Sequence, residues 1–144
     1  MGDSWQRQNP LPGAGGDDVT VARLTNAAFP GPKPALLVMT AIHAREYPTA
    51  ELGLRFVEWL VRNHGLHPDA TWVLDHHEVH VLVQSNPDGR VRAQAQAGGS
   101  GGAAQRKNMN TLACGSGRLG VDLNRNYGFE WGAHNGSSPN ACQD

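Results

Sequence analysis

The stretch PALLVMTAIHAREYPTAELGLRFVEWLVRN, residues 34–63, decides the fold that we predict for this chain. Its first part, PALLVMTAI (34–42), is a continuous apolar run bounded by turn residues, which is typical of a strand buried on both faces of an α/β sheet. We therefore expect this strand to be central. From Pro48 onward apolar residues recur at helical spacing, and Gly65 suits a stop, so a helix of about 15 residues should follow the strand.

Strand-like segments flank this unit on both sides. VTVARLT (19–25) alternates apolar and polar residues, and HEVHVLVQ (77–84) is a second apolar run. A strand, a helix and a strand in succession make one crossover unit, which predicts an α/β fold. The NPDG that comes next (86–89) suits a type I turn, with Pro87 in its second position and Gly89 in its fourth.

Beyond Arg90 the composition changes, because GGSGG (98–102) and many Asn, Gly and Ser residues leave few apolar side chains to bury. We expect a long irregular surface, with VDLN (121–124) as a short extended piece. Cys114 and Cys142 lie in this region, where a cross-link would stabilise the chain more than it would inside a packed helix. Their spacing alone leaves open a disulfide or two unrelated free thiols.

The composition excludes several classes of partner. The chain has 144 residues, enough for one domain or a piece of one. Lys and Arg number 12 against 13 Asp and Glu, so no net charge would draw the chain to nucleic acid or to an anionic membrane. The longest apolar run, residues 35–42, is far shorter than the roughly 20 residues of a membrane span. The first residues do not form a secretory signal.

His43 and Glu46 follow the predicted central strand and precede the predicted helix. Ligand sites of open α/β sheets gather at this position, and an imidazole with a carboxylate is a zinc ligand set. The alternative is a surface histidine beside a first-turn carboxylate, and the spacing alone does not decide between them. We interpret His76, His77 and His80 as polar positions at the opening of a strand and within it, not as ligands.

Four motifs change this balance by their order: HAREY (43–47), NPDG (86–89), QRKN (105–108) and VDLNRN (121–126). Together they resemble the zinc carboxypeptidases of the carboxypeptidase A type, peptidase family M14. The opening GDSW, the segment VARLTN and the cysteine pair are similar to extracellular bacterial and animal members. The resemblance covers nearly the whole chain. It implies a mixed, largely parallel central sheet flanked by helices, and a metallocarboxypeptidase that hydrolyses the C-terminal peptide bond with a zinc-activated water.

The resemblance also implies roles for individual residues, in a complete domain that binds one Zn²⁺ ion. It implies that His43 and Glu46 are zinc ligands and that Arg106 is the catalytic cation beside the scissile carbonyl. Asn124 and Arg125 would bind the terminal carboxylate, and Arg45 would line the neighbouring subsite. Cys114 and Cys142 would form a disulfide.

Elementary chemistry supports these roles but does not require them. A guanidinium binds a carboxylate by two parallel hydrogen bonds, so Arg125 could select a chain end over an internal bond. Arg106 could stabilise an oxyanion, an effect typically worth about 3–4 kcal/mol. Without the resemblance, Arg106 and Lys107 form a solvated basic pair, and Asn124 with Arg125 a polar turn. We interpret Asp122 as a structural carboxylate and keep it outside the site.

The family's third zinc ligand, its substrate-binding Tyr and its general-base Glu have no match in the sequence. We therefore expect residues 1–144 to be a partial catalytic domain, truncated at both ends, inactive alone and marginally stable. The expected partner is a peptide or protein with a free C-terminal carboxylate, bound by a protein that is monomeric when complete and lies outside the cell or in the periplasm. The alternative is an inactive fragment that acts as a peptide C-terminus or metal-binding module.

Overall fold

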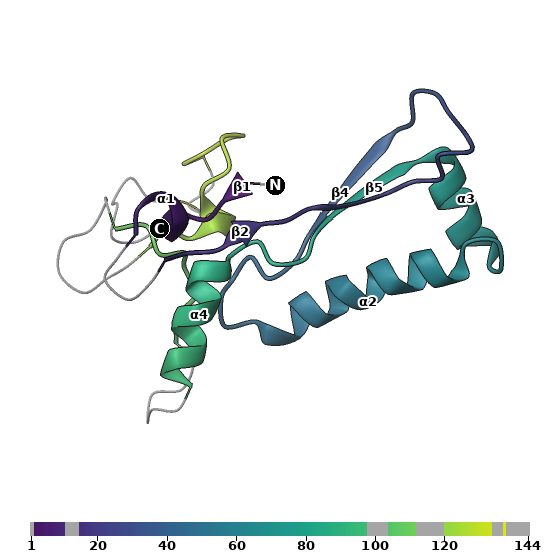
Figure 1. Ribbon diagram of the computed structural model, residues 1–144. Coiled ribbons are helices and arrows are strands. Elements are labelled where there is room, and N and C mark those ends of the chain that lie inside the picture. The colour runs from purple at the N-terminus through teal and green to yellow at the C-terminus, as the bar shows by residue number, and fades with distance from the viewer. Residues whose placement is uncertain (1, 11–14, 98–103, 112–119, 134–136, 138–144) are drawn as a thin grey trace. The chain divides into compact units, whose positions relative to one another are not determined.

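The computed structural model describes residues 2–10, 15–97, 104–111, 120–133 and 137 (Figure 1). The chain divides into two compact units. The sheet unit contains Thr20–Ala41 and Tyr47–Ser85, and the loop unit contains Met1–Val19, Ile42–Glu46 and Asn86–Asp144. Cys114 and Cys142 lie outside the described residues, so their expected disulfide stays a prediction. None of the described helices has the length and apolar character that would let it span a membrane.

The sheet unit is built on one crossover, as its sequence predicts. Strand β4 (Ala35–Met39) leads to helix α2 (Tyr47–Asn63), then to helix α3 (Pro68–His76) and strand β5 (Glu78–Leu82), which pairs parallel to β4. Strand β3 (Ala22–Leu24) pairs antiparallel to β5, which gives the order β3-β5-β4. The mixed sheet with its helices confirms the predicted α/β class.

The core of the sheet unit lies between the sheet and its two helices, with α2 running beside the strands (Figure 1). Residues of β5 alternate between partly and fully buried, because successive side chains of a strand point to opposite faces. Val79 and Val81 are completely buried, and each contributes about 1.5–3 kcal/mol of apolar burial. The remaining buried members of this cluster are Leu60, Ala70 and Leu74.

The prediction of a central, doubly buried strand at 34–42 is wrong for the described sheet. β5 holds the centre and β4 pairs only with β5. Leu36 and Leu37 of β4 remain 51% and 58% exposed. An apolar run indicates that both faces of a strand can be buried, but the described part of the chain covers only one face of β4.

Helix α3 was not predicted, although a proline at its first position is a common sequence signal for the start of a helix. Pro68 is its first residue, and the ring of His67 accepts a hydrogen bond from the N–H of Asp69. His76 is the last residue of α3 and His77 is its C-cap. The prediction that these two histidines open a strand is therefore wrong, while His80 lies within β5 as predicted.

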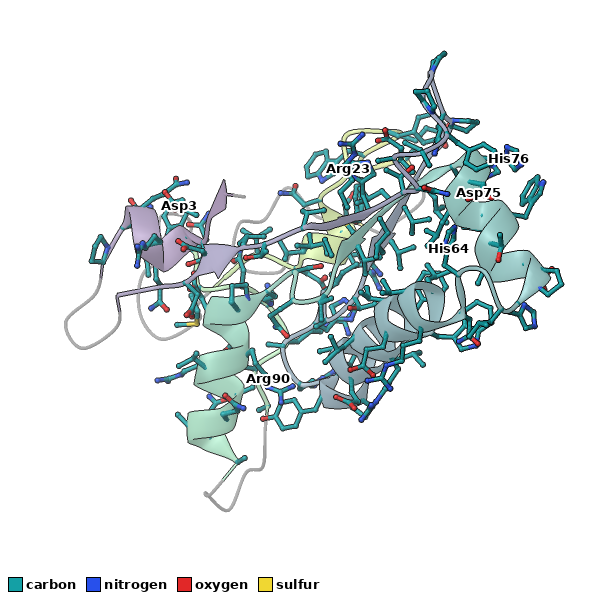
Figure 2. All side chains as sticks on the ribbon, turned by 45° about the vertical axis from the view of Figure 1, so that its right-hand side comes forward. Asp3, Arg23, His64, Asp75, His76 and Arg90 are labelled. Carbon is teal, nitrogen blue, oxygen red and sulfur yellow. The ribbon has the colours of Figure 1, made fainter. Side chains whose placement is uncertain are left out.

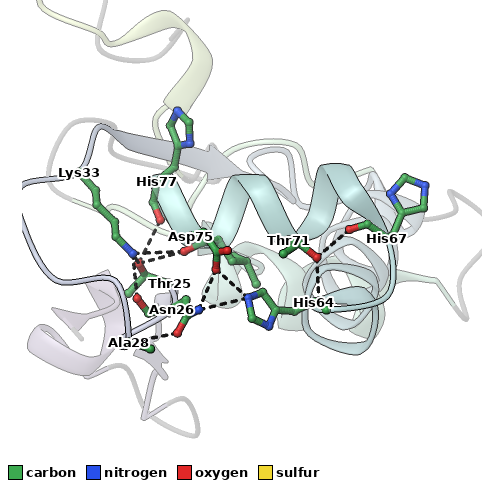
Figure 3. A network of polar contacts seen from close by, with 11 residues as sticks. Thr25, Asn26, Ala28, Lys33, His64, His67, Thr71, Asp75 and His77 are labelled. Carbon is green, nitrogen blue, oxygen red and sulfur yellow. Dashed lines mark hydrogen bonds and ion pairs between the residues drawn. The ribbon is translucent and has the colours of Figure 1, made fainter.

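A polar network fastens the loop after β3 to α3 and to the end of α2 (Figure 3). Asp75 Oδ1 lies 2.9 Å from His64 Nε2 and accepts a 2.7 Å hydrogen bond from Asn26 Nδ2. Figure 2 labels His64 and Asp75 in this part of the sheet unit. The hydrogen bond from His64, then that from Asn26, lowers the pKa of Asp75. Lys33 Nζ donates to Thr25 Oγ1 and to the Asn26 carbonyl at 2.9 and 2.8 Å.

The loop unit contains short elements. Strands β1 (Gly2–Asp3) and β2 (Asp18–Val19) pair antiparallel, and helix α1 (Trp5–Gln8) lies between them in the sequence. Helix α4 (Pro87–Gln96) and the 3-10 helix η1 (Leu123–Arg125) follow later in the chain. The predicted strand 19–25 is thus divided between β2 and β3.

Two local predictions for this unit are wrong. NPDG is not an isolated turn, because Asn86 caps α4 and Pro87 is its first residue. A type I turn and the start of a helix have similar backbone angles, so the four residues alone cannot separate them. VDLN is not extended: Asp122 caps η1, and its Oδ1 accepts from the N–H of Asn124 at 2.9 Å.

Candidate functional site

A short turn, residues 42–46, joins β4 to α2 and presents both predicted zinc ligands. Ala41, just before it, has a left-handed backbone with φ of 52°, which turns the chain sharply at the end of the strand. The N–H of Glu46 donates to the His43 carbonyl at 3.1 Å. Nδ1 of His43 and Oε1 of Glu46 consequently lie 2.8 Å apart. His43 is buried, and the Glu46 side chain is 44% exposed.

Asp122 faces the other nitrogen of the His43 ring. Its Oδ1 lies 3.3 Å from His43 Nε2, an ion-pair distance without hydrogen-bond geometry. Metal-binding histidines commonly present one ring nitrogen to the metal and the other to a carboxylate, which fixes the ring. The two carboxylates on opposite sides of His43 therefore leave Nδ1, on the Glu46 side, as the nitrogen suited to a metal.

Arg106 links the two carboxylates of this cluster. Its Nε donates to Asp122 Oδ2 at 2.8 Å, and its Nη1 lies 3.6 Å from Glu46 Oε1. Burial raises the pKa of Asp122, but the hydrogen bonds from Arg106 and the Asn124 N–H and the charges of Arg106 and His43 outweigh it and leave that pKa below its ordinary value. Asp122 is thus held as a buried anion between two cationic or polar partners.

Backbone pairing brings these distant residues together. The N–H of Asn108 donates to the Val121 carbonyl at 3.1 Å, and the N–H of Val121 donates to Asn108 Oδ1 at 2.8 Å. This pairing sets Arg106 beside Asp122. The N–H of Ala44 donates to the Arg106 carbonyl at 3.0 Å, which attaches the turn 42–46 to the same segment.

The residues expected to bind a substrate carboxylate lie on η1, directly after Asp122. Asn124 and Arg125 are both exposed. Arg125 Nη1 donates to the Asn124 carbonyl at 2.8 Å, and within the described residues it forms no ion pair. Both residues line a shallow pocket of about 160 Å³ with three exposed aromatic residues, Tyr127, Phe129 and Trp131.

The structure therefore brings His43, Glu46 and Arg106 into one cluster and adds Asp122, which sequence reasoning had set aside. The signal for Asp122 was its place in VDLNRN, two residues before Asn124. Arg45 is exposed, and in the described part of the chain its side chain forms no hydrogen bond or ion pair with this cluster.

The donor set fits part of a zinc site. An imidazole nitrogen and a carboxylate oxygen are ordinary zinc ligands, and here they face each other from one turn. No group of three or more His, Cys, Asp or Glu side chains in the described ranges is arranged to hold a metal ion. A catalytic zinc takes three protein ligands, so a pair of this kind could supply at most two of the three.

Comparisons with known proteins give a consistent result. A family model described as zinc carboxypeptidase matches residues 14–144. A zinc carboxypeptidase of Saccharothrix mutabilis subsp. capreolus is 29% identical over 118 residues, which cover 81% of this chain and 26% of that protein. Carboxypeptidase A2 of Mus musculus is 34% identical over 114 residues, covering 79% of this chain and 26% of that protein.

Solved structures agree with the sequence comparisons. The crystal structure of carboxypeptidase A from Helicoverpa armigera matches with a TM-score of 0.72 and 29% identity, over 98% of this chain and 30% of that one. The chain thus spans about a quarter of the length of the curated relatives that it matches.

Proposed function

Because the chain belongs to the zinc carboxypeptidase family, we propose that it forms the amino-terminal part of the catalytic domain of a zinc-dependent metallocarboxypeptidase. The observation that carries this proposal is the cluster of His43, Glu46, Arg106 and Asp122, assembled from three separate segments of the chain. The substrate would be a peptide or protein with a free C-terminal carboxylate.

His43 and Glu46 would hold the metal. His43 is prepared for this role because Asp122 engages its Nε2 side and leaves Nδ1 toward Glu46. When bound, zinc supplies the Lewis acidity that activates a water molecule for hydrolysis. The third protein ligand and the general-base Glu would come from the part of the domain that the relatives have and this chain does not span.

Arg106 would stabilise the negative charge that develops on the carbonyl oxygen of the scissile bond. Its Nε is committed to Asp122, which fixes the plane of the guanidinium. Its Nη groups remain the donors that could reach a substrate oxygen. A single preorganised donor of this kind contributes about 3–4 kcal/mol to transition-state stability. Asp122 would therefore position both Arg106 and His43.

Arg125 and Asn124 would bind the terminal carboxylate. Both are exposed beside the cluster, and the planar fork of Arg125 matches a carboxylate with two parallel hydrogen bonds. An internal peptide bond offers no such carboxylate. Recognition by these residues would therefore restrict cleavage to the last bond of a chain.

Binding measurements on the full 144-residue chain test this proposal. Isothermal titration with Zn²⁺ should show one site that His43→Ala or Glu46→Gln weakens at least tenfold, since each variant removes a ligand. His80→Ala, which removes an imidazole from the sheet unit, is the matched control and should bind as the unaltered chain does. Equal zinc affinity in all four proteins would contradict the proposed ligands.

Peptide binding tests the other half of the proposal. A short peptide with a free C-terminus should bind more tightly than the same peptide amidated, and Arg125→Ala should remove this difference. Arg55→Ala, which removes an exposed arginine from α2 in the sheet unit, should preserve it. A preference for the free carboxylate that survives Arg125→Ala would exclude Arg125 as the anchor.

A further inference from the structure

We propose that Asn86, the first residue of the NPDG motif, is a positioning residue that holds the turn 42–46 in register with the segment carrying Arg106. This inference rests on the proposed function, because these two segments carry the proposed zinc ligands and the catalytic cation.

The side chain of Asn86 is only 2% exposed, and three backbone groups surround its amide. Its Nδ2 donates to the Ile42 carbonyl and to the Lys107 carbonyl, each at 3.1 Å. Its Oδ1 accepts from the N–H of Gly89 at 3.1 Å, which caps α4. One amide group therefore ties together three segments of the loop unit.

The two donated hydrogen bonds lie directly beside the proposed site in the chain. Ile42 precedes His43, and Lys107 follows Arg106. Since the Ala44 N–H donates to the Arg106 carbonyl at 3.0 Å, the two segments are joined at two points. The Asn86 amide and this backbone hydrogen bond together set the separation of the turn and the segment. The 3.6 Å contact between Glu46 and Arg106 depends on that separation.

Only asparagine satisfies all three partners at this position. Aspartate would keep the cap, because its oxygen accepts equally well, but an ionised carboxylate has no N–H to donate. It would instead place a negative oxygen against two partly buried carbonyls. Serine would also keep a cap, but it is shorter and has one hydroxyl donor for two acceptors. A buried carbonyl that loses its partner is costly.

Gly89 is fitted to the same arrangement. A Cβ at this residue would lie 2.5 Å from Asn86 Oδ1 and 2.6 Å from the Lys107 carbonyl oxygen. No side chain can therefore occupy the fourth position of NPDG while the amide keeps its partners. Asp88, in the third position, accepts from Ser4 Oγ and the Gln6 N–H at 2.6 and 2.8 Å, which secures the amino-terminal segment.

Asn86→Asp separates the positioning role from the cap, and two readouts on the 144-residue chain report the result. The first is amide hydrogen exchange at Ala44 in the metal-free chain, with the His77 amide of the sheet unit as internal reference. The second is the Zn²⁺ dissociation constant by calorimetry. We expect Ala44 to exchange at least tenfold faster and the dissociation constant to rise about tenfold, as for other residues that orient metal ligands.

Asn26→Asp is the matched control, because it also converts a hydrogen-bonded amide into an acid, but in the sheet unit. It should leave Ala44 exchange and zinc affinity unchanged. If Asn86→Asp does not fold, both measurements are repeated with Asn86→Ser, which also keeps a capping oxygen. Loss of His77 protection in both Asn86 variants would show a general folding role and overturn the proposal.

The remaining outcomes are also decisive. Unchanged Ala44 exchange in folded Asn86→Asp, or faster exchange with unchanged zinc affinity, overturns the positioning role. If the unaltered chain binds zinc no better than His43→Ala, the proposed function fails by itself. In that case Ala44 exchange in the metal-free chain still decides whether Asn86 holds the two segments together.

Discussion

Replacing Asp122 should destabilise the loop unit by an amount that depends on the substitution. The Asp122 side chain is 8% exposed, and it accepts hydrogen bonds from Arg106 Nε and the Asn124 N–H. Asp122→Ala removes both. A hydrogen bond to a charged group is worth about 1.5–3 kcal/mol and a helix cap about 1 kcal/mol, so the total cost should be about 2.5–4 kcal/mol.

Asp122→Asn is the more informative change, because asparagine has nearly the same size and caps a helix equally well. It keeps one oxygen for the N–H of Asn124, but it removes the negative charge and sets an NH2 donor against Arg106 Nε, so the hydrogen bond from Arg106 is lost. Arg106 is 28% exposed, so water compensates part of that loss. We therefore expect a cost of about 1–2 kcal/mol, clearly below that of Asp122→Ala.

Hydrogen exchange at the Val121 amide, measured in increasing urea, gives the free energy of opening at this position in the loop unit. Asp18→Ala is the control in the same unit, because the one ion pair of the Asp18 side chain among the described residues is an exposed contact with Arg7, which should contribute less than about 1 kcal/mol. The reasoning is refuted if Asp122→Ala costs no more than Asp18→Ala, or if Asp122→Asn and Asp122→Ala cost the same.

Three further predictions concern other parts of the chain. The hydrogen bond from Arg23, then that from His80, lowers the pKa of Glu78 from 4.5 to about 2. The stabilisation of the folded chain by ionised Glu78 should therefore be complete above pH 4.5 and be lost as the pH falls toward 2. A carbon NMR titration should show this pKa, and Arg23→Ala should return it toward 4.5. Gly120→Ala should separate residue 120 from the segment that holds Arg106, since the new Cβ would lie 1.8 Å from the Asn108 carbonyl oxygen. Circular dichroism and hydrogen exchange at Ala44 would detect this loss of pairing, and values equal to those of the unaltered chain would contradict the prediction. The 144-residue chain alone should release no C-terminal residue from a synthetic dipeptide, since two ligands hold zinc poorly; chelator-sensitive release would show that the chain is catalytic by itself.

The crossover unit of the sheet could be predicted because its signals are local. An apolar run, a change to helical spacing at Pro48 and a second apolar run are all legible within the segments that form β4, α2 and β5. The position of β4 at the edge is not legible there. It depends on which strands pair with β5, and β3 comes from a separate part of the sequence.

The site shows the same division between local and distant information. His43 and Glu46 could be considered as zinc ligands from four consecutive residues and their place after a strand, but it took the order of the four motifs to favour them over a surface histidine beside a first-turn carboxylate. Asp122 could not, because its contacts with His43 and Arg106 depend on pairing between segments far apart in the sequence. The role of Asn86 could not be predicted for the same reason, because its partners Ile42 and Lys107 lie 44 and 21 residues away in the sequence.

Direct observation of the histidine rings during zinc addition is the sharpest test of the central claim, that His43 and Glu46 bind zinc together. The chain has 7 histidines, which nitrogen NMR can separate by ring atom. We expect Nδ1 of His43 to respond at the lowest zinc concentration, and Glu46→Gln to abolish that response. Zinc that first perturbs other histidines and leaves the His43 ring unchanged would contradict the claim.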